Sequence, residues 1–163
     1  MTDIKLREIT LDDTDFMIRL VNDPEAKRYI PGMIADDEMM KAWISNLGES
    51  EHEFIVEADG VPVGECNLTV CDDMAEIGFM LLPEFWRRGY GTRIVTMLLE
   101  KAKALHITEI TARTDSANTA SVRLLTKTGF QALRTGWMLR ISEDEDDDAP
   151  IAGQNIIDFL LTL

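Results

Sequence analysis

A short turn rich in arginine and glycine carries the clearest chemical pattern in the sequence. It reads Arg-Arg-Gly-Tyr-Gly over residues 87–91 and joins an apolar segment to an amphipathic one. Glycines let a ligand approach the backbone closely, and the free amides at a helix start carry a partial positive charge. Arg87, Arg88 and Arg93 add charge in a chain that is otherwise acidic. The turn therefore predicts a seat for a pyrophosphate.

Two other phosphate-binding motifs do not fit this turn. A dinucleotide fingerprint would need a third glycine where Ile94 stands, and a P-loop would need Gly-Lys-Ser/Thr after the turn. A Gly-x-Gly turn alone is weak evidence, so its meaning depends on a second segment.

That second segment is 118–130, which reads NTASVRLLTKTGF, with an Asn-x-x-Ser spacing and a Gly-Phe ending after a short helix. With both motifs the sequence resembles the GNAT superfamily (Gcn5-related N-acetyltransferases), and most closely its RimJ/RimL-like ribosomal-protein branch. Trp86 stands at the first position of the family's phosphate loop, a replacement common in that branch. The resemblance covers nearly the whole chain and implies a single acetyltransferase domain over 1–163 that uses acetyl-CoA.

The resemblance also implies the residues that contact acetyl-CoA. Strand backbone would meet the pantetheine arm and thioester, amides of the turn would hold the pyrophosphate, and an asparagine would contact the cofactor beside them. In that order, the residues are Phe79, Met80 and Leu81; Arg87, Arg88, Gly89, Tyr90, Gly91 and Thr92; and Asn118. Of these contacts, only the one between the helix start and the phosphates can also be inferred from the residue types without the resemblance.

Acyl transfer to an amine needs a neutral nitrogen, and the cost of removing its proton depends on the amine. At pH 7 that cost is about 1 kcal/mol for an α-amino group of pKa ~7.8 and roughly 4.6 kcal/mol for a lysine-like amine of pKa ~10.4. A thiolate of pKa ~8.5 leaves without much help. A protein N-terminus therefore needs only a mild base, whereas a lysine or polyamine needs a stronger one.

Two catalytic residues that the resemblance would suggest are replaced in this chain. Leu125 stands where many relatives have a tyrosine that protonates the sulfur, and Arg113 stands where some have a catalytic glutamate. The resemblance to the RimJ/RimL branch suggests Ser121 as a hydrogen-bond donor to the sulfur. The alternative is that Ser121 only caps the helix at 119–127.

Two glutamates are the candidate general bases. Glu76 lies in an otherwise apolar strand, where burial would raise its pKa; alternatively it is a carboxylate in water at the strand end. Glu65 shares a polar strand face with Asn67 and Thr69 and is a candidate relay base. Cys66 has no activating histidine nearby, so direct attack in a ternary complex is expected over an acyl-cysteine.

The periodicity predicts the elements that position these groups. The expected order is β-α-α-β-β-β-α-β-α-β-β, a mixed, mostly antiparallel α/β sheet of about seven strands with about four helices. An Asp-Gly turn at 59–60 joins two strands as a hairpin, and 74–82 reads as a strand buried on both faces. The expected strands are 4–9, 53–58, 61–70, 74–82, 109–114, 130–141 and 156–161, and the expected helices are 12–22, 36–47, 91–105 and 119–127.

Composition limits the kinds of protein that the chain can be. It has 163 residues, no secretory signal and no apolar run of ~18 residues, so a single cytoplasmic domain is expected. The two cysteines and two histidines are not clustered, so no metal is expected. A formal net charge of −14 argues against nucleic-acid binding. The acidic run 142–148 reads as a solvated loop, or as a field that attracts cationic amines.

Three functions remain open. The first is an acetyl-CoA-dependent N-acetyltransferase acting on a protein N-terminus or a small amine. The second acetylates polyamines, aminoglycosides or similar amines, which the acidic surface favours slightly. The third is a non-catalytic acyl-CoA sensor. Acceptor choice is expected to depend on 26–47 and 137–153, and a homodimer is one expectation because dimers are common in this family.

Overall fold

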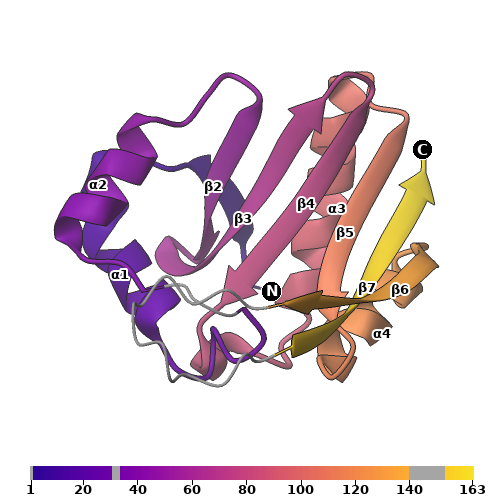
Figure 1. The fold of residues 1–163 in the computed structure, drawn as a ribbon. Coiled ribbons are helices and arrows are strands. Elements are labelled where there is room, and N and C mark those ends of the chain that lie inside the picture. The colour runs from indigo at the N-terminus through magenta and orange to yellow at the C-terminus, as the bar shows by residue number, and fades with distance from the viewer. Residues whose placement is uncertain (1, 31–33, 140–152) are drawn as a thin grey trace.

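The computed structural model describes residues 2–30, 34–139 and 153–163 (Figure 1). Within them lie seven strands and four helices, as expected, with most boundaries within about three residues of prediction. The strands are β1 Ile4–Glu8, β2 Glu51–Ala58, β3 Val61–Cys71, β4 Met74–Leu81, β5 Glu109–Asp115, β6 Gln131–Leu139 and β7 Gly153–Thr162. The helices are α1 Thr14–Asn22, α2 Asp37–Ser45, α3 Tyr90–Ala104 and α4 Thr119–Lys127. The acidic run 142–148 lies outside the described residues.

All seven strands form one mixed sheet in the order β1-β2-β3-β4-β5-β7-β6. Only β4 and β5 pair in parallel, across the crossover through α3, and every other neighbouring pair is antiparallel. The predicted α/β class is confirmed. The insertion of β7 between β5 and β6 does not follow from the order of the elements along the chain.

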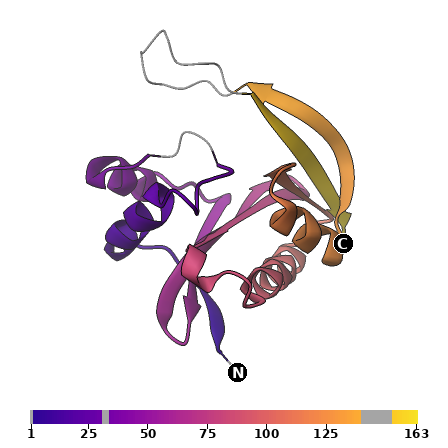
Figure 2. The ribbon, with the colours of Figure 1, turned by 90° about the horizontal axis from the view of Figure 1, so that it is seen from below.

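The sheet separates two pairs of helices, with α1 and α2 on one side and α3 and α4 on the other (Figure 2). The side chains of Ile94 and Leu98 on α3 are fully buried in the larger core, because residues four apart share one helix face. A smaller core joins Leu20 of α1 to Ile55 and Met80 of the sheet. No helix among the described residues has the length and apolar character to cross a membrane.

The prediction that β4 is buried on both faces is wrong for its first half. Ala75 and Ile77 are buried, whereas Met74 and Glu76 are exposed. The apolar residues Ala75 and Ile77 belong to the larger core, which α3 and α4 share. The opposite face is covered only near Met80, where α1 and α2 pack.

Strands β4 and β5 separate before β4 ends. Their pairing runs from Met74 opposite Glu109 to Ile77 opposite Ala112 and stops, while β4 stays paired with β3 as far as Leu81. Figure 1 shows the two strands diverging toward their C-terminal ends. This gap leaves one edge of the last residues of β4 without a strand partner among the described residues.

Candidate active site

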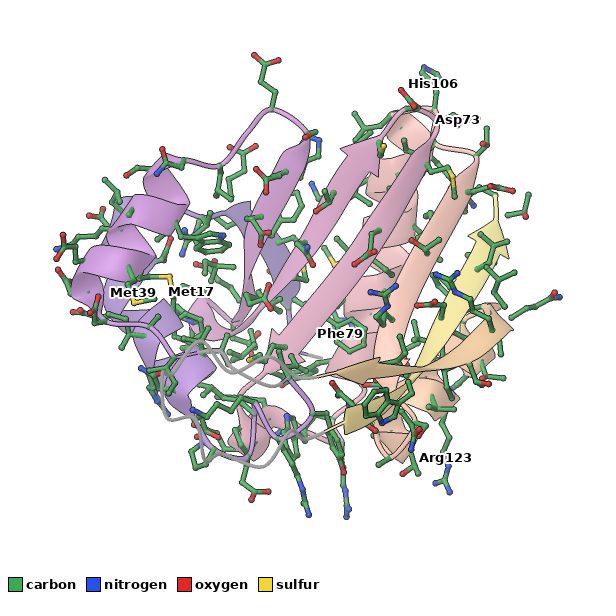
Figure 3. All side chains as sticks on the ribbon, viewed as in Figure 1. Met17, Met39, Asp73, Phe79, His106 and Arg123 are labelled. Atoms are coloured by element: carbon green, nitrogen blue, oxygen red, sulfur yellow. The ribbon has the colours of Figure 1, made fainter. Side chains whose placement is uncertain are left out.

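The backbone of β4 faces the gap at alternate residues. The Leu82 amide donates to the Val63 carbonyl at 3.0 Å, which fixes the pleat so that the backbone of Met80 faces β3 and that of Phe79 and Leu81 faces the gap. The Leu81 carbonyl accepts a hydrogen bond from the Trp86 indole at 2.8 Å. Phe79 lies toward the C-terminal end of β4, far from Asp73 at the other end of the sheet (Figure 3).

A pocket of about 360 Å³ opens at this gap. It is lined by the end of β4, the turn before α3, the start of α4 and the connection between α1 and α2. The gap therefore connects the face that carries α3 and α4 with the face that carries α1 and α2. The predicted site residues that line the pocket are Phe79, Met80, Leu81, Arg87, Gly91, Asn118 and Ser121.

The turn before α3 has the backbone that an anion seat requires. Gly89, the N-cap of α3, has φ 78° and ψ 3°, and Arg87 also has a left-handed φ of 59°. The next residues, Tyr90, Gly91 and Thr92, begin the helix, and no side chain caps their amides among the described residues. These amides and the dipole of a 15-residue helix favour negative charge at this end.

The three arginines near this turn have different surroundings. Arg87 lines the pocket. The Arg88 guanidinium donates to the Glu84 carbonyl at 2.8 Å and lies over the Phe85 ring. That of Arg93 donates to the Thr2 carbonyl at 2.7 Å. Of the three arginines, only Arg87 therefore lines the pocket; Arg88 and Arg93 are bonded to backbone carbonyls outside it.

Helix α4 begins at the edge of the pocket and is capped by Asn118. The Asn118 Oδ1 accepts from the Ser121 amide at 3.2 Å, so the helix cap is Asn118 and the alternative role of Ser121 as the cap is wrong. Ser121 is one of the residues that line the pocket, and its hydroxyl has no hydrogen-bond partner within the described ranges. Gly91 allows α3 and α4 to approach, since a Cβ there would lie 2.4 Å from the Leu124 Cδ1.

Glu76 is not in the environment that was expected. Its side chain is exposed and lines a second, shallower groove with Thr69 and Thr111, away from the gap. The expectation that Glu76 is buried is therefore wrong, because no helix among the described residues covers this part of the sheet face.

Glu65 lies close to the gap. It is opposite Met80 in the β3–β4 register and opposite Ile55 in the β2–β3 register, so its side chain shares their face. The side chain is half-buried, and desolvation raises the pKa of its carboxyl to about 7.

Glu53 on β2 is a second carboxylate here, and it is not among the residues predicted from the sequence. It is opposite Asn67, which makes it a diagonal neighbour of Glu65 on the same face. Burial, together with the charges of Glu65 and Glu51, raises the pKa of Glu53 to about 8. The pairing of the predicted 53–58 and 61–70 strands around the Asp-Gly turn is the pattern that could have indicated it.

Arg113, at the position of the family's glutamate, is part of an ion-pair cluster. Its Nε donates to the Asp158 carboxylate of β7 at 2.7 Å, and Arg134 of β6 donates to the other oxygen. Both guanidinium groups lower the pKa of the nearly buried Asp158. The cluster joins β5, β7 and β6, so Arg113 has a structural role in holding these strands together.

Comparisons with known proteins agree with this geometry. The chain matches the Acetyltransferase (GNAT) domain over residues 3–131. An uncharacterized N-acetyltransferase, p20 of Bacillus licheniformis, is 28% identical over 141 residues, covering 78% of this chain and 79% of p20.

Two solved structures share the fold at low sequence identity. The spermidine N-acetyltransferase of Vibrio cholerae, in complex with CoA and spermine, has a TM-score of 0.82 at 18% identity and covers 98% of this chain and 95% of its own. A ribosomal-protein-alanine N-acetyltransferase from Brucella melitensis has a TM-score of 0.78 at 16% identity, covering 98% and 99%. The fold is that of the acetyltransferases. The chain belongs to the GNAT family and is an N-acetyltransferase of that family.

Proposed function

We propose that this enzyme transfers the acetyl group of acetyl-CoA to a primary amine by direct attack in a ternary complex. The observation that carries the proposal is the pocket that opens at the β4–β5 gap beside the N-terminus of α3. One end offers free amides to a diphosphate, and the gap offers the edge of a strand, without a partner strand in the described part of the chain, to an extended arm. These features fit a coenzyme A thioester.

The binding roles follow the two edges of the gap. We assign the backbone of Phe79 and Leu81 to the pantetheine arm and the amides between Arg87 and Thr92 to the pyrophosphate. Asn118 lies beside both, at the start of α4. Met80 contributes its side chain to the wall of the pocket, because its backbone is paired with β3.

The chain's own residues supply the remaining chemistry. Acetyl-CoA brings an activated thioester, and we assign the Ser121 hydroxyl to donate a hydrogen bond to the leaving sulfur. Burial raises the pKa of the Cys66 thiol, which keeps it protonated and disfavours an acyl-cysteine. Glu65 is the proposed base; the exposed Glu76 is less suited to that role.

The proposed acceptor is a protein N-terminus or a small amine. A half-buried carboxylate with a pKa of about 7 is a mild base, which suits an α-amino group. The likeness to the ribosomal-protein-alanine enzyme and Trp86 in the phosphate loop favour the RimJ/RimL-like branch.

A polyamine or other small cationic amine is the second candidate. The acidic side chains of Glu53 and Glu65 on the face behind the pocket favour it, as does the net charge of −14. The spermidine enzyme with the same fold is consistent with this alternative.

The test is to incubate the protein with acetyl-CoA and separate panels of amines while the release of free thiol is measured. Turnover with peptides that have free N-termini supports the first candidate, and turnover only with diamines or triamines supports the second. Coenzyme A binding without turnover on any amine would replace the proposal by a non-catalytic acyl-CoA sensor. If the protein has no affinity for coenzyme A, both the acetyltransferase proposal and the sensor alternative are overturned.

Location and assembly stay predictions. Both cysteines are free, as a reducing cytoplasm would keep them. We propose a cytoplasmic enzyme that is a monomer or a homodimer; size-exclusion chromatography with light scattering distinguishes the two states.

A further inference from the structure

Two glutamates, Glu53 of β2 and Glu65 of β3, lie on the sheet face that α1 and α2 cover. The proposed function uses only Glu65, as the base. Glu53 and Glu65 are diagonal neighbours, about 7–8 Å apart between their Cα atoms, within reach of two long side chains. Both are half-buried, and Glu65 lies about 5 Å from Met80 between Cα atoms of opposite residues. Neither residue lines the pocket itself: Glu65 is one strand away from the pocket wall at Met80, and Glu53 is two strands away.

The pocket at the gap is lined from both faces of the sheet, so a cofactor bound at the start of α3 leaves the other face open to the acceptor. The amides proposed to bind the pyrophosphate lie at the start of α3, on the α3 and α4 side of the sheet. Met80 and Glu65 point to the other face, where Met80 packs against α1 and α2. Glu65 consequently lies on the face left for the acceptor.

No cation neutralises the pair within the described ranges. The ion pairs of this region use other carboxylates, since Arg19 pairs with Glu84 and Lys41 with Asp37. The remaining ionisable groups on β2, β3, β4, α1 and α2 are Glu51, His52, Glu57, Cys66, Cys71, Glu76, Asp15 and Glu38. Most of these are acidic. Arg7 of β1 is opposite Ile55 and so shares the face of Glu53, but its guanidinium is bonded to Asp13 and Glu57.

We propose that Glu53 and Glu65 act as one proton-sharing pair that receives the acceptor as an ammonium ion. The inference rests on the proposed function and names the charge class of its acceptor, an alkylammonium. One ammonium proton passes to the Glu65 carboxylate, and the nitrogen lone pair then forms the C–N bond as the C–S bond breaks. The second nitrogen proton goes to the departing sulfur, and Glu65 returns its proton to solvent.

Glu53 has a distinct part in this pair. Close carboxylates in a dry site hold one proton between them, because two adjacent negative charges repel. A bound ammonium removes that repulsion, so the shared proton leaves to solvent and both carboxylates ionise before Glu65 accepts a proton from the ammonium. The pair therefore favours an acceptor that arrives charged over a neutral molecule of the same shape.

The experiment is a pH titration of glutamate side-chain carboxyls by ¹³C NMR in the wild type and in Glu53→Gln, Glu65→Gln and Glu100→Gln. We expect two carboxyls with midpoints near 7 and 8, assigned by their loss in the first two variants. Glu65→Gln should lower the midpoint of Glu53, because a like charge is removed. The control Glu100→Gln changes the net charge equally from an exposed position on α3 and should leave both midpoints unchanged. Midpoints near the ordinary 4.5 for both would overturn the pair.

The second arm repeats the titration with butane-1,4-diamine and with 1,4-butanediol, its uncharged analogue. The diamine should lower the two midpoints by about one pH unit or more, as an opposite charge in contact does, and the diol should leave them unchanged. Equal effects of both compounds, or none, would overturn the inference. Calorimetric titration with coenzyme A separates the failures. If coenzyme A binds but the diamine moves neither midpoint, only this inference fails; if coenzyme A does not bind, the proposed function fails.

Discussion

The two sides of the gap are built from different parts of the chain. The proposed cofactor side is made of backbone: the amides that begin α3, a left-handed glycine and the edge of β4 that has no partner strand among the described residues. The proposed acceptor side is made of side chains, namely Glu53 and Glu65 from two antiparallel strands. Amides at a helix start favour an anion, and neighbouring carboxylates favour a cation. In a chain with a charge of −14, backbone dipoles are thus the proposed means of holding a diphosphate.

The largest expected effect comes from adding a methyl group to Gly64, where β3 packs closely against β4. A Cβ at Gly64 would lie 2.2 Å from the Met80 carbonyl, which is backbone and cannot turn away. We expect Gly64→Ala to lower the free energy of unfolding by about 3 kcal/mol. Chemical denaturation measures this. Gly136→Ala, where the nearest atom would be at 3.8 Å, is the matched control; a loss no greater than the control's would contradict the close contact.

Removing the proposed base should affect the acceptor side alone. We expect Glu65→Gln to lower kcat/KM by about 10²-fold at pH 7 with whichever amine the panel selects. The loss should shrink at pH 9, because the neutral fraction of an alkylamine with a pKa of ~10.4 rises about tenfold per pH unit. Glu100→Gln should keep normal activity. A loss equal at both pH values would indicate a structural defect instead.

Straining the cofactor side should leave the acceptor side intact. Gly89 has φ 78°, and a Cβ added there would meet nothing within 4 Å, so Gly89→Ala adds backbone strain without a clash. We expect a rise of about five- to tenfold in the Kd of coenzyme A, from roughly 1 kcal/mol of strain. Gly60→Ala, with φ 79° at the distant hairpin turn, is a control with the same strain. Equal Kd values for the two variants would contradict the anion seat.

Ser121 lies where the two sides meet. We expect Ser121→Ala to lower kcat by about fivefold, the loss of one hydrogen bond of ~1 kcal/mol, while coenzyme A binds as before. Ser45→Ala, exposed at the end of α2, is the control. An unchanged kcat would remove Ser121 from the proposed chemistry.

The smallest effect is on stability and needs no substrate. The pKa of Glu53 is about 8 in the folded chain and near 4.5 when unfolded, so the folded chain binds more protons between these values. Wild-type stability should therefore fall as pH rises through this window. Glu53→Gln cannot ionise, so its Tm should gain on the wild type by roughly 3 °C from pH 5 to pH 8, a fraction of the full linkage because solvent screens a half-buried carboxylate. A Tm difference between Glu53→Gln and the wild type that stays constant with pH would contradict the raised pKa. Such a constant difference is expected for Glu100→Gln.

The cofactor side is easier to predict from the sequence than the acceptor side, and the reason is physical. A seat made of consecutive amides lies in one short stretch, so the turn 87–91 predicts it once the second segment, 118–130, supports that interpretation of its glycines. The Glu53–Glu65 pair depends on the register of two strands, which sequence spacing specifies only through the hairpin turn. The prediction for Glu76 is wrong because an apolar strand does not reveal which of its faces the helices cover. The position of β7 could not be predicted for a related reason. Asp158 of β7 pairs with Arg113 and Arg134, and these contacts join residues that are far apart in the sequence.

The most direct test of the central claim is to follow backbone amides by ¹H–¹⁵N NMR as coenzyme A is added. The gap and the start of α3 should respond together, so we predict shifts at Phe79 and Leu81 and across the turn from Arg87 to Thr92. The amides of Asp73 and His106, at the opposite end of the sheet, should stay unchanged. Shifts gathered at that opposite end, or none at saturating coenzyme A, would contradict the account.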